Sequence, residues 1–381
     1  MILRKFTSLK KWAMASGSSV LPSKRFDVGF ICSHPVDEVW VRSTALECVR
    51  RGLTVELVVC GGAISDCVKR TYSDKRVSVS CYPELSALPK GSYGALITAS
   101  SGLDRSMFRS NAKYFVHMPH SLCSLHMIYP EDAFKGYDAL FACGPHHERE
   151  FAALSKKLGV DPKECFPIGY GKLDILAASM VRAKEPVSVN KRKCVLIAPS
   201  WGGGNLIDSF GTDLCELLLD DGLEVVVRPH PMFFMEERAE LKDFVQLQKN
   251  HPFFKLENPM SSDGEAILRA DVLVGDYSGV SLEFAALRRM PVVSVNVPPK
   301  VVNRHWEEIG IEPIELKIRE SIGVLVDSDL TAVSEAVSSI VSAPKIERTS
   351  QADISSFLYG GTGSCSLEAF NALSSLLGGE L

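Results

Sequence analysis

Two successive series of short apolar runs organise the chain, and the second series begins about half-way along the sequence. The runs of the first series are residues 26–32, 53–60, 95–98, 114–117 and 139–143, and those of the second are residues 194–198, 224–228, 272–274 and 292–295. Helical or loop sequence separates most of them. Short, nearly continuous apolar runs are typical of strands buried on both faces of a parallel sheet. The sequence therefore predicts an α/β fold with two doubly wound sheets covered by helices.

The length of 381 residues also indicates two domains, because a single ordinary core rarely grows so large. A stretch rich in Ala, Ser, Lys and Arg, with Pro186 inside it, separates the two series and is typical of a linker. The helix expected over 367–377 could cross back onto the first domain. We expect five segments along the chain. They are a basic N-terminal segment (residues 1–25), a first Rossmann-like domain (26–175), a linker (176–193), a second Rossmann-like domain (194–350) and a C-terminal helical segment (351–381). Ligands bind such sheets at the carboxyl ends of their strands, which places a cleft between the domains.

Composition excludes several classes of function. The formal net charge is -4, so the whole chain has no broad attraction to nucleic acid, and we expect no nucleic-acid partner. Eleven cysteines occur without a C-x-x-C pair or a zinc-ligand spacing, which is typical of a reduced, cytoplasmic protein. No apolar run reaches the roughly 18–20 residues that a membrane-spanning helix needs.

The N-terminal 25 residues differ from the rest in charge. Apolar Leu3, Phe6 and Leu9 recur near helical spacing, and no acidic residue occurs before Asp27. The basic residues of this segment are Arg4, Lys5, Lys10, Lys11, Lys24 and Arg25. Two interpretations remain open: a solvated tail, or a short amphipathic helix that makes a peripheral contact with the inner face of the cytoplasmic membrane.

A glycine-rich loop follows the first strand of the second series, at residues 199–205. Three consecutive glycines remove side-chain bulk, so backbone N–H groups there could approach an anionic ligand. Ser200, Gly202 and Gly203 are therefore candidate donor-binding residues. A flexible loop without a ligand is the alternative.

The next strand ends in Arg228 and His230, each followed by a proline. An arginine and a histidine at the carboxyl end of a strand would face the cleft, and the prolines would fix the backbone around them. The pair is a reasonable clamp for a pyrophosphate. The alternative is an ordinary turn with exposed polar residues.

A third candidate phosphate site follows the strand at 272–274. A tight turn leads into a helix there, and the N–H groups of a helix N-terminus together with small hydroxyl side chains can bind phosphate. Glu283, one turn into that helix, could accept hydrogen bonds from a ribose or simply complement the helix dipole. The candidate donor-binding residues of this segment are Asp276, Ser278, Gly279, Ser281 and Glu283.

Histidines gather in the first domain after the run that ends near His117. His120 and His126 follow closely, and a histidine facing the cleft could act as a general base, because its ordinary pKa lies near neutrality. The spacing within a proline-containing loop does not predict a metal site. His146 and His147 are expected to flank a helix and to be exposed to solvent.

Taken in order, these segments resemble the CDP-glycerol glycerophosphotransferase family of teichoic-acid and related surface-polymer enzymes, over about residues 110–375. The family's Trp-His-Gly signature corresponds to residues 119–121, and its Gly-Tyr-Pro-Arg-x-Asp segment to residues 169–174. Residues 196–201 are similar to its Tyr-Ala-Pro-Thr-Trp strand and loop. Residues 228–231 match its Arg-x-His-Pro signature, and residues 276–279 match Asp-Tyr-Ser-Ser.

The resemblance implies a GT-B fold and a transferase without a cofactor. A CDP-activated donor would give its polyol phosphate, most simply glycerol phosphate, to a hydroxyl of a polymer or lipid-linked acceptor, and CMP would leave. The first domain would serve the acceptor and the second the nucleotide donor. His120 would be the base, His230 would serve the pyrophosphate, and Ser278 and Gly279 would contact phosphate.

Several residues depart from the family pattern. Pro119 replaces the family's tryptophan and Ser121 its glycine, while Glu283 stands where many members have Asp. A Gly-Tyr-Gly at 169–171 replaces Gly-Tyr-Pro. These changes leave an alternative open, a nucleotide-sugar glycosyltransferase or a UDP-N-acetylglucosamine 2-epimerase-like enzyme of the same fold.

Overall fold

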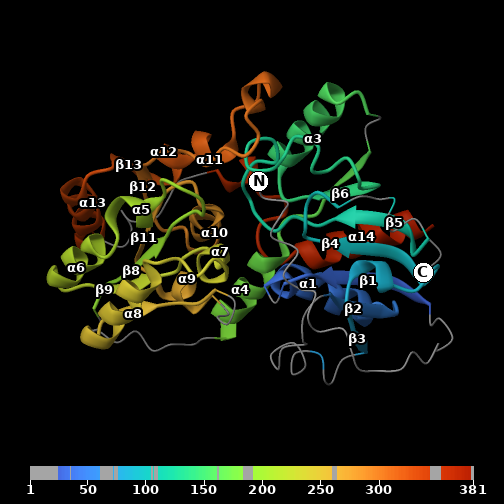
Figure 1. Ribbon diagram of the computed structural model, residues 1–381, viewed down its shortest axis with the longest axis horizontal. Coiled ribbons are helices and arrows are strands. Elements are labelled where there is room, and N and C mark those ends of the chain that lie inside the picture. Colours follow the sequence, from blue (N-terminus) through green and yellow to red (C-terminus); the bar gives the residue numbers. More distant parts are fainter. Residues whose placement is uncertain are drawn as a thin grey trace.

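The protein consists of two lobes, each built on one parallel sheet (Figure 1). The computed structural model describes residues 25–378 except 35, 61–71, 73–75, 104–105, 107–109, 161–162, 183–191, 260–263 and 344–352. The first sheet has the strand order β3-β2-β1-β4-β5-β6-β7. Its strands are β1 (Phe26–Cys32), β2 (Val55–Cys60), β3 (Val77–Tyr82), β4 (Tyr93–Thr98), β5 (Ala112–His117), β6 (Ala139–Ala142) and β7 (Glu164–Pro167).

The second sheet has the order β10-β9-β8-β11-β12-β13. Neighbouring strands are parallel in both sheets; in the second, for example, Leu273 pairs with both Leu196 and Val292. Its strands are β8 (Cys194–Ala198), β9 (Glu224–Val227), β10 (Phe254–Leu256), β11 (Val272–Gly275), β12 (Val292–Asn296) and β13 (Gly323–Asp327). The predicted fold class, two doubly wound Rossmann-like domains, is confirmed.

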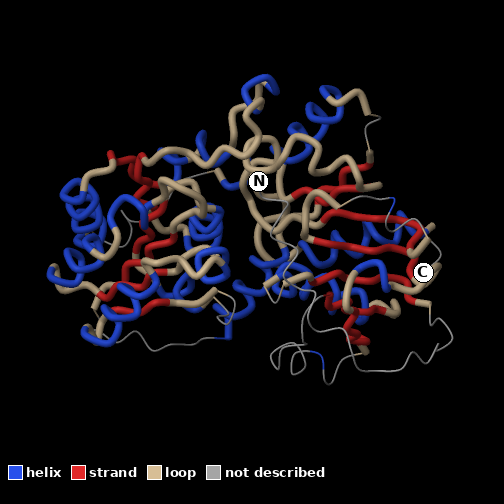
Figure 2. Tube along the Cα trace, viewed as in Figure 1, coloured by secondary structure: helices blue, strands red, loops and turns tan. Residues whose placement is uncertain are grey.

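Helices flank both sheets (Figure 2). The first lobe carries α1 (Asp37–Arg50), α3 (Pro145–Lys157), α4 (Gly171–Arg182) and the single turn η2 (Leu85–Ala87). The second carries α5 (Leu206–Phe210), α6 (Asp213–Asp220), α7 (Pro231–Met235), α8 (Leu241–Asn250), α9 (Glu265–Arg269), α10 (Gly279–Arg288), η4 (Trp306–Ile309), α11 (Ile314–Lys317), α12 (Arg319–Ile322) and α13 (Leu330–Ser342). The chain then continues through η5 (Ile354–Ser356) to α14 (Cys365–Leu377).

The last helix lies on the first lobe, although it follows the second lobe in the sequence. α14 packs against α1, β4 and β7, and Asp174 of α4 accepts a hydrogen bond from the N–H of Ser366 at 3.1 Å (Figure 1). The proposed linker overlaps α4, which extends to Arg182, and residues 183–191 of it lie outside the described residues. The exact domain boundaries stay a prediction.

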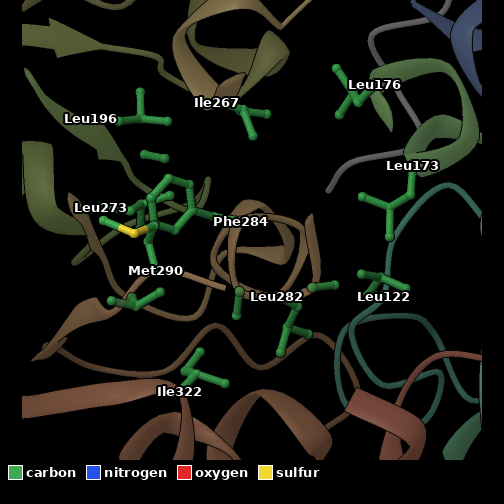
Figure 3. Close-up of a cluster of buried hydrophobic side chains, with 14 of the residues drawn as sticks. Leu122, Leu173, Leu176, Leu196, Ile267, Leu273, Leu282, Phe284, Met290 and Ile322 are labelled. Carbon is green, nitrogen blue, oxygen red and sulfur yellow. The ribbon is translucent and has the colours of Figure 1, made fainter. Parts of the chain in front are cut away.

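One buried apolar cluster joins the two lobes. Leu122 and Leu173 come from the first domain, and Leu273, Leu282 and Phe284 come from the second. Figure 3 shows these side chains gathered around α10. Each carbon buried there stabilises the closed arrangement of the domains, because separating them would expose the cluster to water. The cluster therefore fixes the positions of the two domains relative to each other at the base of the cleft.

Candidate active site

Loops from both sheets meet above this apolar cluster. They follow β5 in the first domain and β8, β9, β11 and β12 in the second, always at the carboxyl end of the strand. The two domains touch directly at this level, where Cys123 Sγ lies 3.7 Å from the carbonyl oxygen of Tyr277. The predicted cleft edge is thus where the candidate residues lie.

Asp276 accepts hydrogen bonds from the backbone of the glycine-rich loop and so fixes its conformation. Its carboxylate is buried and accepts hydrogen bonds from the N–H groups of Ser200 at 2.8 Å and Leu206 at 3.3 Å. Gly202 has a φ of 100°, which a glycine adopts without strain. A side chain at Gly203 would meet open space, so the backbone there is accessible. Asp276 holds the loop in place, and direct contact of these residues with a donor stays a prediction.

Arg228 lies beside an internal carboxylate. The side chain is buried, and its Nη1 lies 3.1 Å from Glu257 Oε2. A buried guanidinium needs such a partner, because the interior of a protein stabilises an isolated charge poorly. Part of its positive charge is therefore already compensated, and its predicted contact with a pyrophosphate remains a prediction.

His230 caps the short helix α7. Its Nδ1 accepts a hydrogen bond from the N–H of Met232 at 3.2 Å, so the proton of the neutral ring is on Nε2. Burial, together with the smaller effects of Lys300, His120 and Lys172, lowers the pKa of His230 to about 3. The residue is consequently a neutral hydrogen-bond donor through Nε2 and not a positive clamp.

His120 has the opposite arrangement. Its Nδ1 donates to the carbonyl oxygen of Ala99 at 2.7 Å, and its Nε2 lies 3.1 Å from the hydroxyl of Tyr129. The ring also packs against Trp40, with 5.0 Å between ring centroids. Burial lowers the pKa of His120 to about 4, so the ring is neutral at physiological pH and Nε2 carries a lone pair. A neutral imidazole oriented through its other nitrogen has the form that a general base requires.

The N-terminus of α10 is the third candidate phosphate site predicted from the sequence. Ser278 caps this helix through its Oγ, which accepts from the N–H of Val280 at 3.3 Å. Gly279 lies against the first domain, because a Cβ there would be 2.7 Å from Ser121 Oγ. Ser281 is buried, and its Oγ lies on the side of Gly275, toward β11. Because the N–H groups of Val280 and Ser281 are already bonded to Oγ and the carbonyl oxygen of Ser278, anion binding at this helix end would depend on the remaining N–H groups and on the helix dipole.

Glu283 binds two side chains of the first domain. Its Oε2 lies 2.6 Å from Lys172 Nζ, and its Oε1 lies 3.1 Å from the hydroxyl of Tyr170. The same hydroxyl lies 2.8 Å from the carbonyl oxygen of His120. Glu283 therefore connects α10 to the backbone of the candidate base, and its predicted contact with a ribose remains a prediction.

One sequence-based expectation about histidines is wrong. His146 and His147 are buried, and their Nε2 atoms lie 2.9 Å from the carbonyl oxygens of Leu122 and Cys123. Their predicted exposure was wrong, because the N-terminus of α3 packs beneath the loop that follows His120. His117 is buried against aromatic rings at the end of β5.

Sequence reasoning missed Lys300, which follows β12. Its Nζ lies 3.6 Å from the centroid of the Trp201 ring, and its Cγ would be 3.9 Å from a Cβ at Gly202. The ring of Trp201 in turn stacks on the imidazole of His230, with 5.8 Å between the ring centroids. The sequence around Lys300 has no motif, so only the fold brings it to the glycine-rich loop.

Within the described residues, no group of three or more His, Cys, Asp or Glu side chains could hold a metal ion. Over the same part of the chain, no helix is long and apolar enough to cross a membrane.

Residues 133–296 match the family described as CDP-glycerol:poly(glycerophosphate) glycerophosphotransferase. The family resemblance is confirmed. The matched segment includes α4, the glycine-rich loop, the Arg228–His230 turn and the N-terminus of α10. It leaves out the loop with His120, which was one of the motifs that carried the resemblance.

Solved structures with a similar fold include a wall teichoic acid polymerase and UDP-N-acetylglucosamine 2-epimerases. The wall teichoic acid polymerase TagF is 11% identical, with a TM-score of 0.59, and the alignment covers 93% of this chain and 90% of TagF. A putative UDP-N-acetylglucosamine 2-epimerase from Listeria monocytogenes is 12% identical, with a TM-score of 0.61, and 92% of this chain and 96% of that chain are covered. At such identities the likeness shows the fold alone. No curated protein matches the sequence.

Ser121 and Gly279 face each other across the domain interface. Because a Cβ at Gly279 would lie 2.7 Å from Ser121 Oγ, the two positions share one small space. The glycine at 279 leaves room for the side chain of Ser121 and allows close contact between the domains.

Proposed function

We propose that the protein transfers glycerol phosphate from CDP-glycerol to a hydroxyl of a surface polymer or a lipid-linked acceptor and releases CMP. The observation that carries the proposal is the family match, which spans the donor-side motifs of the second domain. A neutral, oriented histidine on the acceptor side of the same cleft supports it. The epimerases and sugar transferases of this fold share its architecture, but the family match favours phosphate transfer.

In the proposed reaction, Nε2 of His120 accepts the proton of the acceptor hydroxyl. The acceptor oxygen attacks the phosphorus that bears the glycerol, and the bond from this phosphorus to the bridging oxygen of the pyrophosphate breaks. That oxygen leaves as part of CMP. Nε2–H of His230 and the N–H groups at the start of α10 would donate hydrogen bonds to phosphate oxygens as charge develops on them. Tyr129 would give up its contact with Nε2 when the acceptor arrives.

The direct test offers CDP-glycerol, CDP-ribitol and several UDP-sugars, one at a time, with a polyol-phosphate acceptor. We expect turnover with CDP-glycerol, and we expect it to persist in EDTA because helix N–H groups and protein side chains supply the electrostatic stabilisation. Turnover with a UDP-sugar alone would favour the sugar transferase or epimerase. Complete loss of activity in EDTA, restored by Mg²⁺ or Mn²⁺, would contradict the metal-free mechanism.

We also propose that residues 1–25, most of which lie outside the described residues, make a reversible contact with an anionic membrane near a lipid-linked acceptor. Six basic side chains there would each contribute about 1 kcal/mol, and salt would screen them. Deletion of residues 1–24 should weaken co-sedimentation with anionic liposomes and leave activity on a soluble acceptor intact. Equal co-sedimentation of both proteins at low salt would rule the contact out.

A further inference from the structure

The cations around the cleft differ in whether a carboxylate accompanies them. Nη1 of Arg228 lies 3.1 Å from Oε2 of Glu257, and Nζ of Lys172 lies 2.6 Å from Oε2 of Glu283. Lys300 has neither an ion pair nor a hydrogen bond within the part of the chain that the structure describes, and its Nζ rests instead on the face of Trp201 at 3.6 Å. A cation held on an aromatic face is stabilised, but it keeps its capacity to bind an anion.

The surroundings of Lys300 belong to the candidate active site. Its stem lies against Gly202, and its charge is close enough to both candidate histidines to lower their pKa values. Cys123 and Glu315 raise the pKa of Lys300 when they are ionised, and burial raises the pKa of the Cys123 thiol well above its usual value. Glu315 is itself engaged by Ser124, whose N–H and Oγ donate to its two oxygens at 2.8 and 2.7 Å. No carboxylate of the described residues therefore forms an ion pair with Lys300.

The proposed reaction needs positive charge at this place. A nucleoside diphosphate ester carries two negative charges, and both histidines of the site are neutral at physiological pH. Hydrogen bonds from His230 and from the start of α10 can hold phosphate oxygens, but they supply only partial charges. A side-chain ammonium is the natural complement to such a set, because electrostatic stabilisation dominates phosphoryl transfer.

We propose that Lys300 is the cation that binds the pyrophosphate of the donor, with Trp201 holding it in place while the site is empty. This inference rests on the proposed function for the identity of the donor, but the binding of a pyrophosphate group by Lys300 can be tested without it. Lys300 would then serve the leaving phosphate in the reaction, a role that no motif of the sequence assigns.

The protonation state of Lys300 should make the affinity for pyrophosphate depend on pH. Burial lowers the pKa of Lys300 to about 8, against the weaker opposite effect of Cys123 and Glu315. The ammonium, which binds the anion, is present below this pKa and is lost as the pH rises through it. Affinity for pyrophosphate should therefore fall between pH 7 and pH 9. An arginine in this position would stay charged over that whole range.

The experiment measures binding of inorganic pyrophosphate to the full chain by calorimetry. Lys300→Met should weaken the affinity at pH 7 by about tenfold to a hundredfold, which is typical for loss of a charged hydrogen-bonding group. Lys300→Arg should retain most of the affinity and should lose the decrease between pH 7 and pH 9. Lys249→Met removes an exposed lysine in the last turn of α8 and should change nothing.

Four results would be decisive. Equal affinity of wild type and Lys300→Met, or no measurable binding by the wild type, would overturn the role of Lys300. A pH dependence that persists in Lys300→Arg would do the same, since Lys172, whose pKa is also lowered, would then be the titrating group. Pyrophosphate binding through Lys300 without turnover of any CDP-activated donor would support the cation site and overturn the proposed function.

Discussion

His120 has two ring nitrogens with different tasks, and each is set by its neighbour. The carbonyl oxygen of Ala99 holds the proton on Nδ1, so Nε2 keeps its lone pair for the acceptor. The lowered pKa has a measurable consequence. The base is functional when it is unprotonated, which is the case above its pKa of about 4.

The first prediction concerns the pH dependence of kcat/KM. The acid limb should lie near pH 4 and not near the ordinary histidine value of 6.5, because protonation of His120 begins only there. Glu315, whose pKa burial raises to about 7, is the control, since it could add a limb of its own. An acid limb near pH 6.5 in the Glu315→Gln variant would contradict the environment described for His120.

A second prediction concerns the small space shared by Ser121 and Gly279. Gly279→Ser should destabilise the protein by roughly 1–3 kcal/mol, as overpacking commonly does, because the new Cβ would lie 2.7 Å from Ser121 Oγ. Adding Ser121→Gly should restore most of the loss. Denaturant unfolding of the two single variants and the double variant gives the coupling energy. Simply additive effects would show that the two positions do not share space.

Among the structural elements, the strands show what apolar patterning can and cannot predict. All nine predicted runs correspond to strands, and β1 and β8 have the predicted bounds. The strands that the patterning missed are β3, β7, β10 and β13, which form the two edges of each sheet. An edge strand has a partner on one side only, and these four are partly exposed. The sequences of β3, β7 and β10 carry no continuous apolar run, whereas β13 contains the apolar run 324–326, which the sequence-based prediction overlooked.

Some parts of the candidate site could be predicted from the sequence and others could not. The glycine-rich loop, the His230 turn and the start of α10 were predictable because each follows a buried strand directly, and the carboxyl ends of parallel strands meet at one edge. Lys300 was not, because it is four residues beyond β12 in a loop without a motif. The partners of Glu283 and Arg228 were not predictable either, since Lys172 and Glu257 are distant in the sequence.

A third prediction separates the two roles of His230 in α7. His230→Ala should lower turnover by at least about two orders of magnitude, because a donor to the developing charge is lost. The same change also removes the cap of α7, at a cost of about 1 kcal/mol. His230→Asn keeps a capping oxygen for the N–H of Met232 and should keep stability without restoring turnover. Near-normal kcat in either folded variant would remove His230 from the mechanism.

At the scale of the whole molecule, apolar and polar contacts together hold the domains in one arrangement. The buried cluster around α10 includes residues of both domains. Further polar contacts connect them at a second place, where Asn303 Nδ2 donates to the carbonyl oxygen of His126 at 2.9 Å and Ser124 binds Glu315. These contacts fix the position of the candidate base in the first domain relative to the candidate phosphate-binding groups in the second.

The fourth prediction concerns the interdomain ion pair of Lys172 and Glu283. Lys172→Met should lower the free energy of unfolding by about 3–5 kcal/mol, because it leaves Glu283 buried without its cation. The double variant Lys172→Met with Glu283→Met should recover much of this loss. Denaturant unfolding monitored by circular dichroism measures both. A single variant as stable as the wild type would show that the pair does not join the domains.

The central claim is that a phosphate group of the donor moves to the acceptor, and the nucleotide product reports this most directly. The measurement incubates the full chain with CDP-glycerol and a polyol-phosphate acceptor and identifies the nucleotide released by chromatography. The account predicts CMP, in one-to-one ratio with newly formed phosphodiester, and at least a hundredfold less of both from His120→Asn, as expected for loss of a general base. Release of CDP in place of CMP would mean that the bond to glycerol breaks, and it would contradict the account.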